Sequence, residues 1–344
     1  MRDQTEMIAE WLQKVEGGGD LSAQEAEEIM GELLEGRLEQ AQIVALLTSL
    51  RSKGEAVEEL VGFARAMRRR VNHGGAQAQL APLVDTCGTG GDGGSTFNVS
   101  TAAAVVVAGA GVRVAKHGNR SFSSRCGSAD VLEALGVKID IPQERALAAI
   151  EKVGIGFLFA PNMHTAMKHA AAARREAGGR TIFNLLGPLT NPAGATAQVI
   201  GVPAPALVDK LGHALAELGT EHAFVVHGVD GIDEVSLSDE TEVAEVRPHS
   251  VKCYRVKPED FGVQRARREN LAGGDAAENA VIIRGILEGE AGPRRDFVCI
   301  NAAAALVAAG RAADFREGTR LAQQAIDSGS ARAKLAALIE FTRG

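Results

Sequence analysis

The stretch Asp85-Thr-Cys-Gly-Thr-Gly-Gly-Asp-Gly-Gly-Ser-Thr-Phe-Asn-Val-Ser-Thr101 decides how the rest of the chain is interpreted. It begins in an apolar run typical of a buried strand, Leu83–Cys87, and leads into an Ala- and Val-rich helical segment, Val99–Ala108. Glycines let several backbone N–H groups turn toward one anion, and a helix start adds partial positive charge. A tight turn with a Ser, Thr or Asn cap is the alternative, but the glycine run is longer than a turn requires. The stretch therefore predicts a phosphate-binding loop.

Two common nucleotide-binding motifs do not fit this loop. Gly88, Gly90 and Gly93 match G-x-G-x-x-G, but a dinucleotide site also needs an Asp or Glu about 20 residues further on. The next apolar run, Val112–Lys116, is instead followed by His-Gly-Asn-Arg. A Walker loop is excluded because no Gly-Lys-Ser/Thr follows the glycines. The general prediction of an anion site remains.

A second polar loop follows the run Val112–Lys116. It reads Lys116-His-Gly-Asn-Arg-Ser-Phe-Ser-Ser124, and Gly127-Ser-Ala-Asp130 then opens a helix. Lys and Arg make charge-assisted hydrogen bonds to phosphate oxygens. A solvated polar loop would explain either loop alone. Two such loops on consecutive strands predict a ligand with two phosphate ends.

An acidic segment, Gly228-Val-Asp-Gly-Ile-Asp-Glu234, follows the apolar run Ala223–His227. An Asp-Gly turn explains Asp230, but it does not explain Asp233 and Glu234. Magnesium takes oxygen ligands and usually bridges to substrate phosphates. An acidic metal site facing a basic phosphate loop is the arrangement expected where pyrophosphate departs.

Outward from these loops, the chain divides into a helical start and a strand–helix alternation. Helices are expected at Thr5–Val15, from Ser22 (with Glu25 as a capping box) to Gly36, at Leu38–Ser52 and around Val57–Met67. The segment Val71–Pro82 has the composition of a linker. Beyond it, strands are expected at Leu83–Cys87, Val112–Lys116, Ile155–Phe159, Gln198–Val202 and Ala223–His227, and helices at Val99–Ala108, Ala129–Leu135, Thr165–Ala177 and Ala206–Leu218. This alternation predicts an α/β fold with a mostly parallel sheet, whose ligands bind at the carboxyl ends of the strands.

The composition excludes several classes of protein. Lys plus Arg is 37 and Asp plus Glu is 44, a net charge of −7, which argues against a general nucleic-acid binder. The four cysteines lack metal-ligand or disulfide-framework spacing. The first residues lack a signal peptide's apolar core, and the longest apolar run, Thr101–Val112, is too short to span a bilayer. We expect a cytoplasmic protein with no nucleic-acid or membrane partner.

Six motifs, in order over roughly residues 85–234, together resemble the anthranilate phosphoribosyltransferase family. They are Cys87–Asp92, Asn98–Thr101, Lys116–Arg120 with Ser123-Ser124, Gly127–Asp130, Arg180–Pro192 and His227–Glu234. The resemblance implies an α/β fold of the nucleoside phosphorylase and phosphoribosyltransferase type. A helical domain, 1–72, joined by part of 164–190, would meet an α/β domain, 80–344, with the active site between them. A homodimer built through the helical part is also implied.

The resemblance further implies which residues bind the substrates. The donor, phosphoribosyl pyrophosphate, would be held by Gly88, Gly91, Asp92, Thr96, Asn98, Val99, Ser100, Thr101, Lys116, His117, Gly118, Asn119, Arg120, Ser121, Phe122, Ser123, Ser124 and Ser128. The acceptor, anthranilate, would contact Gly88, His117, Asn119, Arg174 and Pro188. Two Mg²⁺ ions would be held by Ser100, Asp233 and Glu234. A guanidinium at Arg174 can meet a benzoate carboxylate with two hydrogen bonds.

The implied reaction makes phosphoribosyl-anthranilate and pyrophosphate in tryptophan biosynthesis. The chain departs from the family pattern on the acceptor side. It has His164-Thr165-Ala166 where the family often has His-Pro-Ala, and Ala172-Ala173-Arg174 with Ala177 where Pro-Val-Arg and Leu are common. The shape of the acceptor channel, and the choice between Arg174 and Arg175, stay open. The alternatives are a pyrimidine nucleoside phosphorylase, which needs no acidic metal pair, and a nucleic-acid-binding relative, whose glycine and acidic motifs would be broken.

Overall fold

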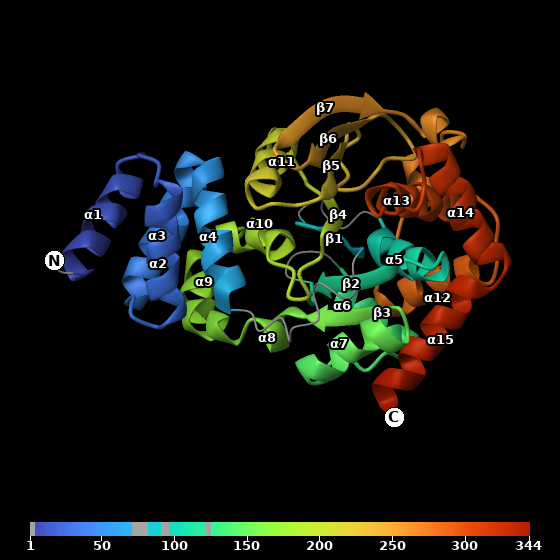
Figure 1. Ribbon diagram of the computed structural model, residues 1–344, viewed down its shortest axis with the longest axis horizontal. Coiled ribbons are helices and arrows are strands. Elements are labelled where there is room, and N and C mark those ends of the chain that lie inside the picture. Colours follow the sequence, from blue (N-terminus) through green and yellow to red (C-terminus); the bar gives the residue numbers. More distant parts are fainter. Residues whose placement is uncertain (1–3, 71–81, 91–95, 122–124) are drawn as a thin grey trace.

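A computed structural model of the chain describes residues 4–70, 82–90, 96–121 and 125–344. It has a helical part and a larger α/β part, which lie side by side along the longest axis (Figure 1). The linker expected at Val71–Pro82 falls outside the described residues except for Pro82. The predicted fold class, a small helical domain with a larger α/β domain, is confirmed.

Four short helices form the helical part, as the sequence predicts. They are α1 (Gln4–Glu16), α2 (Ala23–Leu34), α3 (Gln40–Lys53) and α4 (Val57–Arg70). Ser22 and Glu25 form the expected capping box, because the amide of each residue donates to the side chain of the other. Apolar residues such as Ile29, Leu33 and Phe63 are buried in one core between the helices. The segment 165–189 adds further helices to this core.

One seven-stranded sheet forms the centre of the α/β part. Its strands are β1 (Leu83–Gly88), β2 (Arg113–Gly118), β3 (Ile155–Phe159), β4 (Ala197–Gly201), β5 (His222–Gly228), β6 (Thr241–Arg247) and β7 (Ser250–Val256). The spatial order is β3-β2-β1-β4-β5-β6-β7, in which β1 to β5 run parallel and β6 and β7 are antiparallel. The expectation of a mostly parallel sheet is correct.

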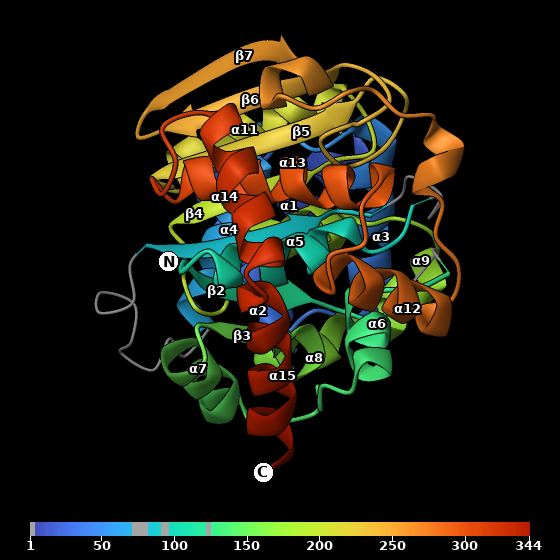
Figure 2. The same ribbon diagram turned by 90° about the vertical axis from the view of Figure 1, so that its right-hand side faces the viewer.

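Helices cover both faces of this sheet (Figures 1 and 2). Alternate residues of β5 show this, because Phe224 and Val226 belong to one apolar core and Ala223 and Val225 to another. The helical elements of the α/β part and of the segment that joins the helical part are α5 (Val99–Gly109), α6 (Ser128–Leu135), α7 (Gln143–Lys152), α8 (Ala160–Met163), η2 (Thr165–Ala170), α9 (Ala171–Ala177), α10 (Ile182–Leu189), α11 (Ala206–Glu217), η3 (Pro258–Phe261), η4 (Arg268–Leu271), α12 (Ala276–Leu287), α13 (Pro293–Ala308), α14 (Phe315–Asp327) and α15 (Ser330–Arg343).

Two local expectations need correction. Strands β6 and β7 were not predicted, because the edge strand β7 is mostly exposed and its charged residues interrupt any apolar run. The expected single helix Thr165–Ala177 is a 3-10 segment, η2, followed by the short helix α9. Ala166, Ala170, Ala173 and Ala177 are at helical spacing along the whole segment, so periodicity could not reveal the division.

The strand order predicts a crevice at the carboxyl ends of β1 and β4. The chain passes from β1 to β2 and β3 on one side, then returns to β4 on the other side of β1. Such a reversal leaves an opening above the strand ends, where ligands bind in open α/β sheets. Gly88 ends β1 and pairs in register with Gly201, which ends β4. The candidate site is therefore expected above these two glycines.

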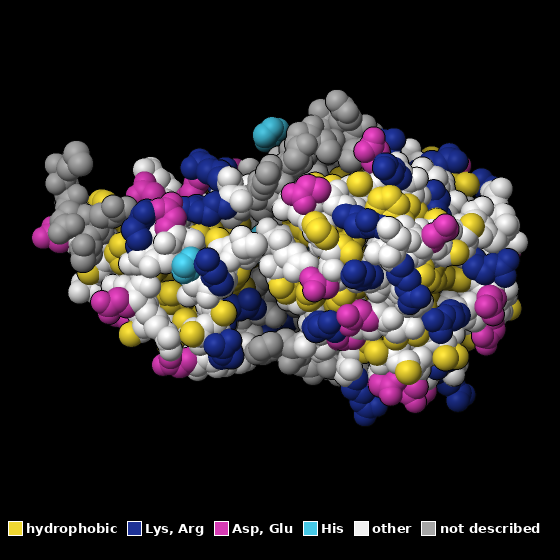
Figure 3. Space-filling view, turned by 90° about the horizontal axis from the view of Figure 1, so that it is seen from below, with side chains coloured by type: hydrophobic (Ala, Val, Ile, Leu, Met, Phe, Trp, Pro, Cys, Tyr) yellow, Lys and Arg dark blue, Asp and Glu magenta, His cyan; other side chains and the backbone are white. Residues whose placement is uncertain are grey.

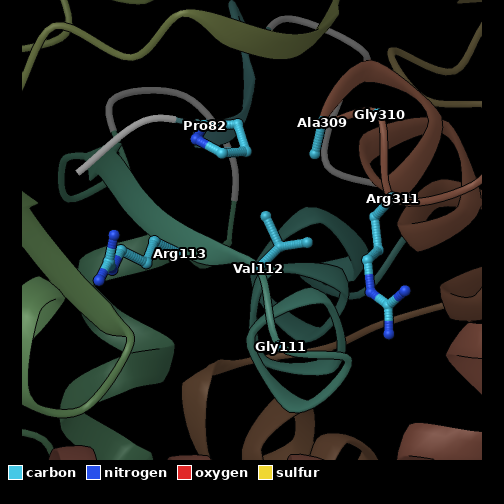
Figure 4. Close-up of a pocket in the computed structure, with 7 residues that line it drawn as sticks. All are labelled: Pro82, Gly111, Val112, Arg113, Ala309, Gly310 and Arg311. Carbon is cyan, nitrogen blue, oxygen red and sulfur yellow. The ribbon is translucent and has the colours of Figure 1, made fainter. Parts of the chain in front are cut away.

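Other surfaces of the molecule carry less functional information. A hollow of about 370 Å³ lined by Gly111, Arg113 and Arg311 lies at the amino end of β2, away from the crevice (Figure 4). Helices α5 and α13 end there, and Arg311 donates to the carbonyl of Ala110, which suits helix termination rather than anion binding. Positive and negative side chains are intermixed on the face shown in Figure 3. Among the described residues, no helix is long and apolar enough to cross a bilayer.

Candidate functional site

Two glycines make room for the acidic segment directly above the sheet. A Cβ at Gly201 would overlap the backbone carbonyl of Asp233, and a Cβ at Gly88 would lie 2.8 Å from the Oδ2 atom of Asp233. Asp233 is 8% exposed and Glu234 is partly exposed beside it. The predicted acidic pair therefore lies at the end of β1, where the glycine-rich loop begins.

Internal hydrogen bonds give the acidic loop its shape. The amide of Gly228 donates to Ile232 at 2.9 Å, and that of Gly231 donates to Gly228 at 2.7 Å. The carboxylate of Asp230 accepts hydrogen bonds from the hydroxyls of Ser236 and Ser238. The loop is thus a compact turn that aims the residues after it at the crevice, which explains why Asp230 precedes the acidic pair.

The glycine-rich loop is described at both of its ends. The amide of Thr89 donates to the carbonyl of Gly201 at 2.9 Å, which keeps the loop start on β4. Arg180 approaches from the segment before α10 and donates through Nη1 to the carbonyl of Gly90. The predicted donor residues Gly91 and Asp92 lie outside the described residues. Thr96, at the far end, pairs with Ala272 in an isolated bridge.

The start of α5 lies beside the end of β1. The hydroxyl of Thr86 donates to the carbonyl of Ser100 at 2.9 Å. Asn98 is at the N-cap position but makes no capping hydrogen bond, because its side chain donates to Cys126 and accepts from Asn279. The capped-turn explanation of these polar residues therefore does not hold for Asn98. The side chains of Val99 and Thr101 are buried, and the Thr101 hydroxyl has no hydrogen-bond partner among the described residues.

Lys116 lies below the surface of the crevice. It is 3% exposed, and its Nζ atom donates to the carbonyl of Thr86 at 2.5 Å. Buried Asp85, on the same strand as Thr86, accepts from the amide of His117 at 3.1 Å and from Asn191 at 2.8 Å. Burial raises the pKa of Asp85 to about 6, while Lys116 opposes the shift. The basic loop thus rests on a buried polar network.

The rest of the basic loop surrounds the start of α6. Arg120 was expected to meet phosphate, but its guanidinium is paired with Asp130 at 3.0 Å and Glu133 at 2.5 Å. These carboxylates raise the pKa of Arg120. The Asn119 carbonyl accepts from the Ser128 hydroxyl, and the amide of Ser121 donates to Asp130. The space at Gly118 is filled by Ser128. Phe122, Ser123 and Ser124 lie outside the described residues.

His117 and His164 form a buried pair near α10. Their ring centroids are 5.1 Å apart, and the Nδ1 atom of His117 lies 3.2 Å from the carbonyl of Gly187. The Nε2 atoms of both rings are buried without a hydrogen-bond partner among the described residues. Burial lowers the pKa of His117 to about 3 and that of His164 to about 4. Both rings are therefore neutral near pH 7.

This pair makes a spectroscopic prediction. The ring carbon resonances of His117 and His164 should not shift between about pH 5.5 and 8, where an ordinary histidine titrates. Below about pH 6.5 the unfolded rings take up protons and the folded rings do not. The free energy of unfolding should therefore decrease as the pH is lowered below about 6.5. NMR of ¹³C-histidine protein, assigned with His117→Asn and His164→Asn, measures the shifts, and urea-unfolded protein is the titrating reference. A midpoint near 6.5 in the folded protein would contradict the neutral pair.

The acceptor side is built on α9 and α10. The Arg174 guanidinium lies over the Phe183 ring, 5.0 Å from its centroid, and burial lowers its pKa. Phe183 and Gly187 are four residues apart and share one face of α10. Gly187 has open space where a Cβ would be, while buried Pro188 follows it in the helix. An open space therefore lies beside Gly187. The carbonyl of Gly187 contacts the His117 ring, and Phe183, on which the Arg174 guanidinium stacks, lies on the same face of α10.

The neighbouring Arg175 differs from Arg174 in its exposure to solvent. It is exposed, whereas Arg174 is partly buried. Arg51 on α3 donates to the carbonyls of Gly178 at 2.5 Å and Arg180 at 3.3 Å, so the turn after α9 is held by the helical part. Gly178, with a φ of 59°, adopts the left-handed conformation that this turn requires. The geometry supports Arg174 over Arg175 as the acceptor residue.

Sequence reasoning did not assign roles to four residues that shape this site. His164 was noted only as part of a departure from the family pattern, and Arg180 only as the start of a motif. A charged Asp85 inside an apolar strand was a usable signal, since buried carboxylates need partners. Asn301, on α13, lies 66 positions after the loop residue Val235 that it contacts. Its pairing follows from tertiary packing alone.

Comparison with known proteins finds close similarity over nearly the whole chain. Residues 80–332 match a family described as "Glycosyl transferase family, a/b domain", and residues 9–71 match its helical bundle domain. Anthranilate phosphoribosyltransferase from Desulfosudis oleivorans is 55% identical, covering 98% of this chain and 99% of that protein.

Two solved structures are similar in sequence and fold. The crystal structure of anthranilate phosphoribosyltransferase from Thermus thermophilus is 45% identical with a TM-score of 0.90, covering 97% of this chain and 99% of that one. The enzyme from Saccharomyces cerevisiae, in complex with PRPP (phosphoribosyl pyrophosphate) and Mg, is 26% identical with a TM-score of 0.85, covering 99% and 98%.

Proposed function

Because this chain belongs to the anthranilate phosphoribosyltransferase family, we propose that the crevice above Gly88 and Gly201 is its active site. The chain transfers the phosphoribosyl group of PRPP to the amine of anthranilate, a step of tryptophan biosynthesis. The main evidence for this location is the close packing of Asp233 against Gly88 and Gly201, which brings the acidic segment next to the glycine-rich loop. The full-length similarity favours this function over a nucleoside phosphorylase or a nucleic-acid-binding relative.

The proposed donor site lies between the glycine-rich loop and the basic loop. Backbone amides at the start of α5 and around Gly88 would meet phosphate oxygens, since a helix start favours anions. Lys116 is buried below the loop, where burial lowers its pKa and the nearby Asp85 opposes that shift. For Arg120, two carboxylates compete with any phosphate, so its direct contact requires that these pairs open. The roles of Thr96, Asn98, Ser121 and the loop residues outside the described ranges stay predictions.

Magnesium fits the acidic segment. Asp233 and Glu234 offer oxygen ligands beside the start of the glycine-rich loop. Magnesium is usually bound through one or two carboxylates together with substrate phosphates, so two acids beside a phosphate loop are a suitable ligand set. We propose that Ser100, Asp233 and Glu234 hold two ions. When bound, Mg²⁺ would neutralise charge on the departing pyrophosphate.

The protein's own contribution to the reaction is positioning and electrostatics. An aryl amine is already neutral near pH 7, so attack on the ribose carbon requires no strong base. His117, with a pKa of about 3, is a weak base and is suited to orienting the amine through its neutral ring. Arg174 would hold the benzoate carboxylate, and Gly187 would leave room for the ring. Catalysis would then depend on alignment of the two substrates.

The proposed domain arrangement extends the helical part beyond residue 72. Gln40 of α3 donates to Glu176 of α9 at 2.6 Å, and Arg51 binds the turn that follows. These contacts support a helical domain made of 1–72 with part of 164–190, and an α/β domain over 80–344. The family resemblance supports a homodimer built through the helical part, for which sedimentation equilibrium should show twice the mass of one chain.

A fluorescence assay tests the proposed function. The native fluorescence of anthranilate should disappear only when the protein, PRPP and Mg²⁺ are all present, because the product forms only when pyrophosphate can leave. Omission of PRPP, its replacement by free phosphate, and chelation of Mg²⁺ with EDTA are the controls, and each should preserve the signal. Consumption of anthranilate in EDTA would refute the metal requirement, and no consumption under any condition would refute the function.

A further inference from the structure

We infer that Asn301 of α13 is a positioning residue for the acidic pair. The Oδ1 atom of Asn301 accepts from the amide of Val235 at 2.9 Å, and its Nδ2 donates to the carbonyl of Val235 at 3.0 Å. One side chain thus binds both polar groups of the residue that directly follows Glu234. Asn301 is 2% exposed, so neither bond competes with bulk water.

Asn301 is itself held in place. Its Nδ2 also donates to the carbonyl of Phe297 at 2.9 Å, one turn earlier in the same helix. Phe297 is fully buried and packs edge-on against Phe97, with ring centroids 6.0 Å apart. A buried amide whose donor and acceptor are both used defines one side-chain orientation. Because Asn301 has one fixed orientation on α13, its hydrogen bonds to Val235 hold the acidic loop at a fixed position relative to that helix.

The sheet supports the loop at the ends of β5 and β6, where the amide of Gly228 donates to Ile232 and the hydroxyl of Thr241 accepts from the amide of Ser236. Gly88 and Gly201 provide space for Asp233, so they set how closely the loop can approach the sheet. Within the loop, the carboxylate of Asp230 accepts from the hydroxyls of Ser236 and Ser238. Asn301 ties the backbone of Val235, directly after the acidic pair, to helix α13.

This assigns the C-terminal helices a part in the reaction. The inference rests on the proposed metal site, and it states that Asn301 orients Asp233 and Glu234 without touching a substrate. Groups that orient metal ligands usually change metal affinity about 10- to 100-fold when they are removed. Loss of Asn301 should therefore weaken metal binding and leave anthranilate recognition, which lies on α9 and α10, unaffected.

The test compares Asn301→Leu and Asn301→Ser with a matched control. Leu has a similar shape and removes all three hydrogen bonds. Ser can still bond the Phe297 carbonyl, as helix serines do, but cannot reach Val235. Cys299→Ala is the control, because Cys299 is equally buried on the same helix, two residues away. Binding of Mn²⁺ alone is measured by the EPR signal of free Mn²⁺, and folding by thermal denaturation.

Both Asn301 variants should raise the dissociation constant for Mn²⁺ by about tenfold or more, and the Mg²⁺ concentration for half-maximal rate in parallel. The KM for anthranilate should not change, excess Mg²⁺ should restore turnover, and Cys299→Ala should bind Mn²⁺ as the parent does. A folded Asn301→Ser variant with the parental Mn²⁺ affinity would overturn the inference. Asp233→Asn separates this from the proposed site: if it too keeps the parental affinity, the metal site itself is wrong.

Discussion

Replacing Asp233 with Asn and Glu234 with Gln together should abolish magnesium-dependent turnover. Both changes keep the shape of the side chains, so the seat on Gly88 and Gly201 is preserved while the charge of −2 is removed. Loss of metal-based charge stabilisation of about 4 kcal/mol corresponds to a roughly 1000-fold lower kcat. The rate is measured from the loss of anthranilate fluorescence at saturating substrates over a range of Mg²⁺ concentrations.

The nearby Asp230 provides a contrasting variant. Its carboxylate is bound by Ser236 and Ser238, so Asp230→Asn should loosen the loop and cause a smaller loss that higher Mg²⁺ reduces. Full activity in the Asp233→Asn, Glu234→Gln protein would remove the proposed metal site. A partial loss that excess Mg²⁺ completely reverses would show that the two carboxylates assist binding without being required.

Arg174→Ala should raise the KM for anthranilate far more than the KM for PRPP. A hydrogen-bonded charge pair in a partly buried position contributes about 2–3 kcal/mol, which corresponds to a roughly 30- to 150-fold higher KM. The partial burial of Arg174 and its stacking on Phe183 orient the guanidinium, so the pair should be stronger than an exposed one. Steady-state rates with each substrate varied in turn measure the two constants.

Arg175→Ala is the matched control for this prediction. It removes the same side chain one position later, where it is exposed, so the KM for anthranilate should remain at the parental value. Arg174→Lys should recover only part of the loss, because an ammonium group cannot meet a carboxylate through two parallel bonds. An unchanged KM in Arg174→Ala, or a large effect in Arg175→Ala, would contradict the assignment.

The sequence was sufficient to predict the functional loops because each is a local pattern. A glycine run between a strand and a helix, a basic run after the next strand, and two acids after a third strand can all be recognised without knowing the sheet order. Parallel strands bring their carboxyl ends to one edge, so convergence of the three loops followed from the strand–helix alternation. The five parallel strands were found for a related reason, since each is a short run rich in apolar and β-branched residues.

Only the tertiary structure determined which side chains contact one another at the carboxyl-end edge of the sheet. Arg120 reads as a phosphate ligand in the sequence, yet the fold gives it two carboxylates from α6. Nothing in the sequence indicates that His117 is buried, yet packing against His164 and α10 removes it from water and keeps it neutral. Asn301 has no local signal at all.

The physical reason for this division is the range of the interactions. Secondary structure and loop chemistry depend on neighbours a few residues apart, whose spacing the sequence displays directly. Burial, pKa shifts and hydrogen bonds such as that between Asn301 and Val235 depend on groups brought together from distant positions. The chain's order of residues therefore determined the kind of chemistry at the crevice, while packing decided which groups are charged, oriented and available there.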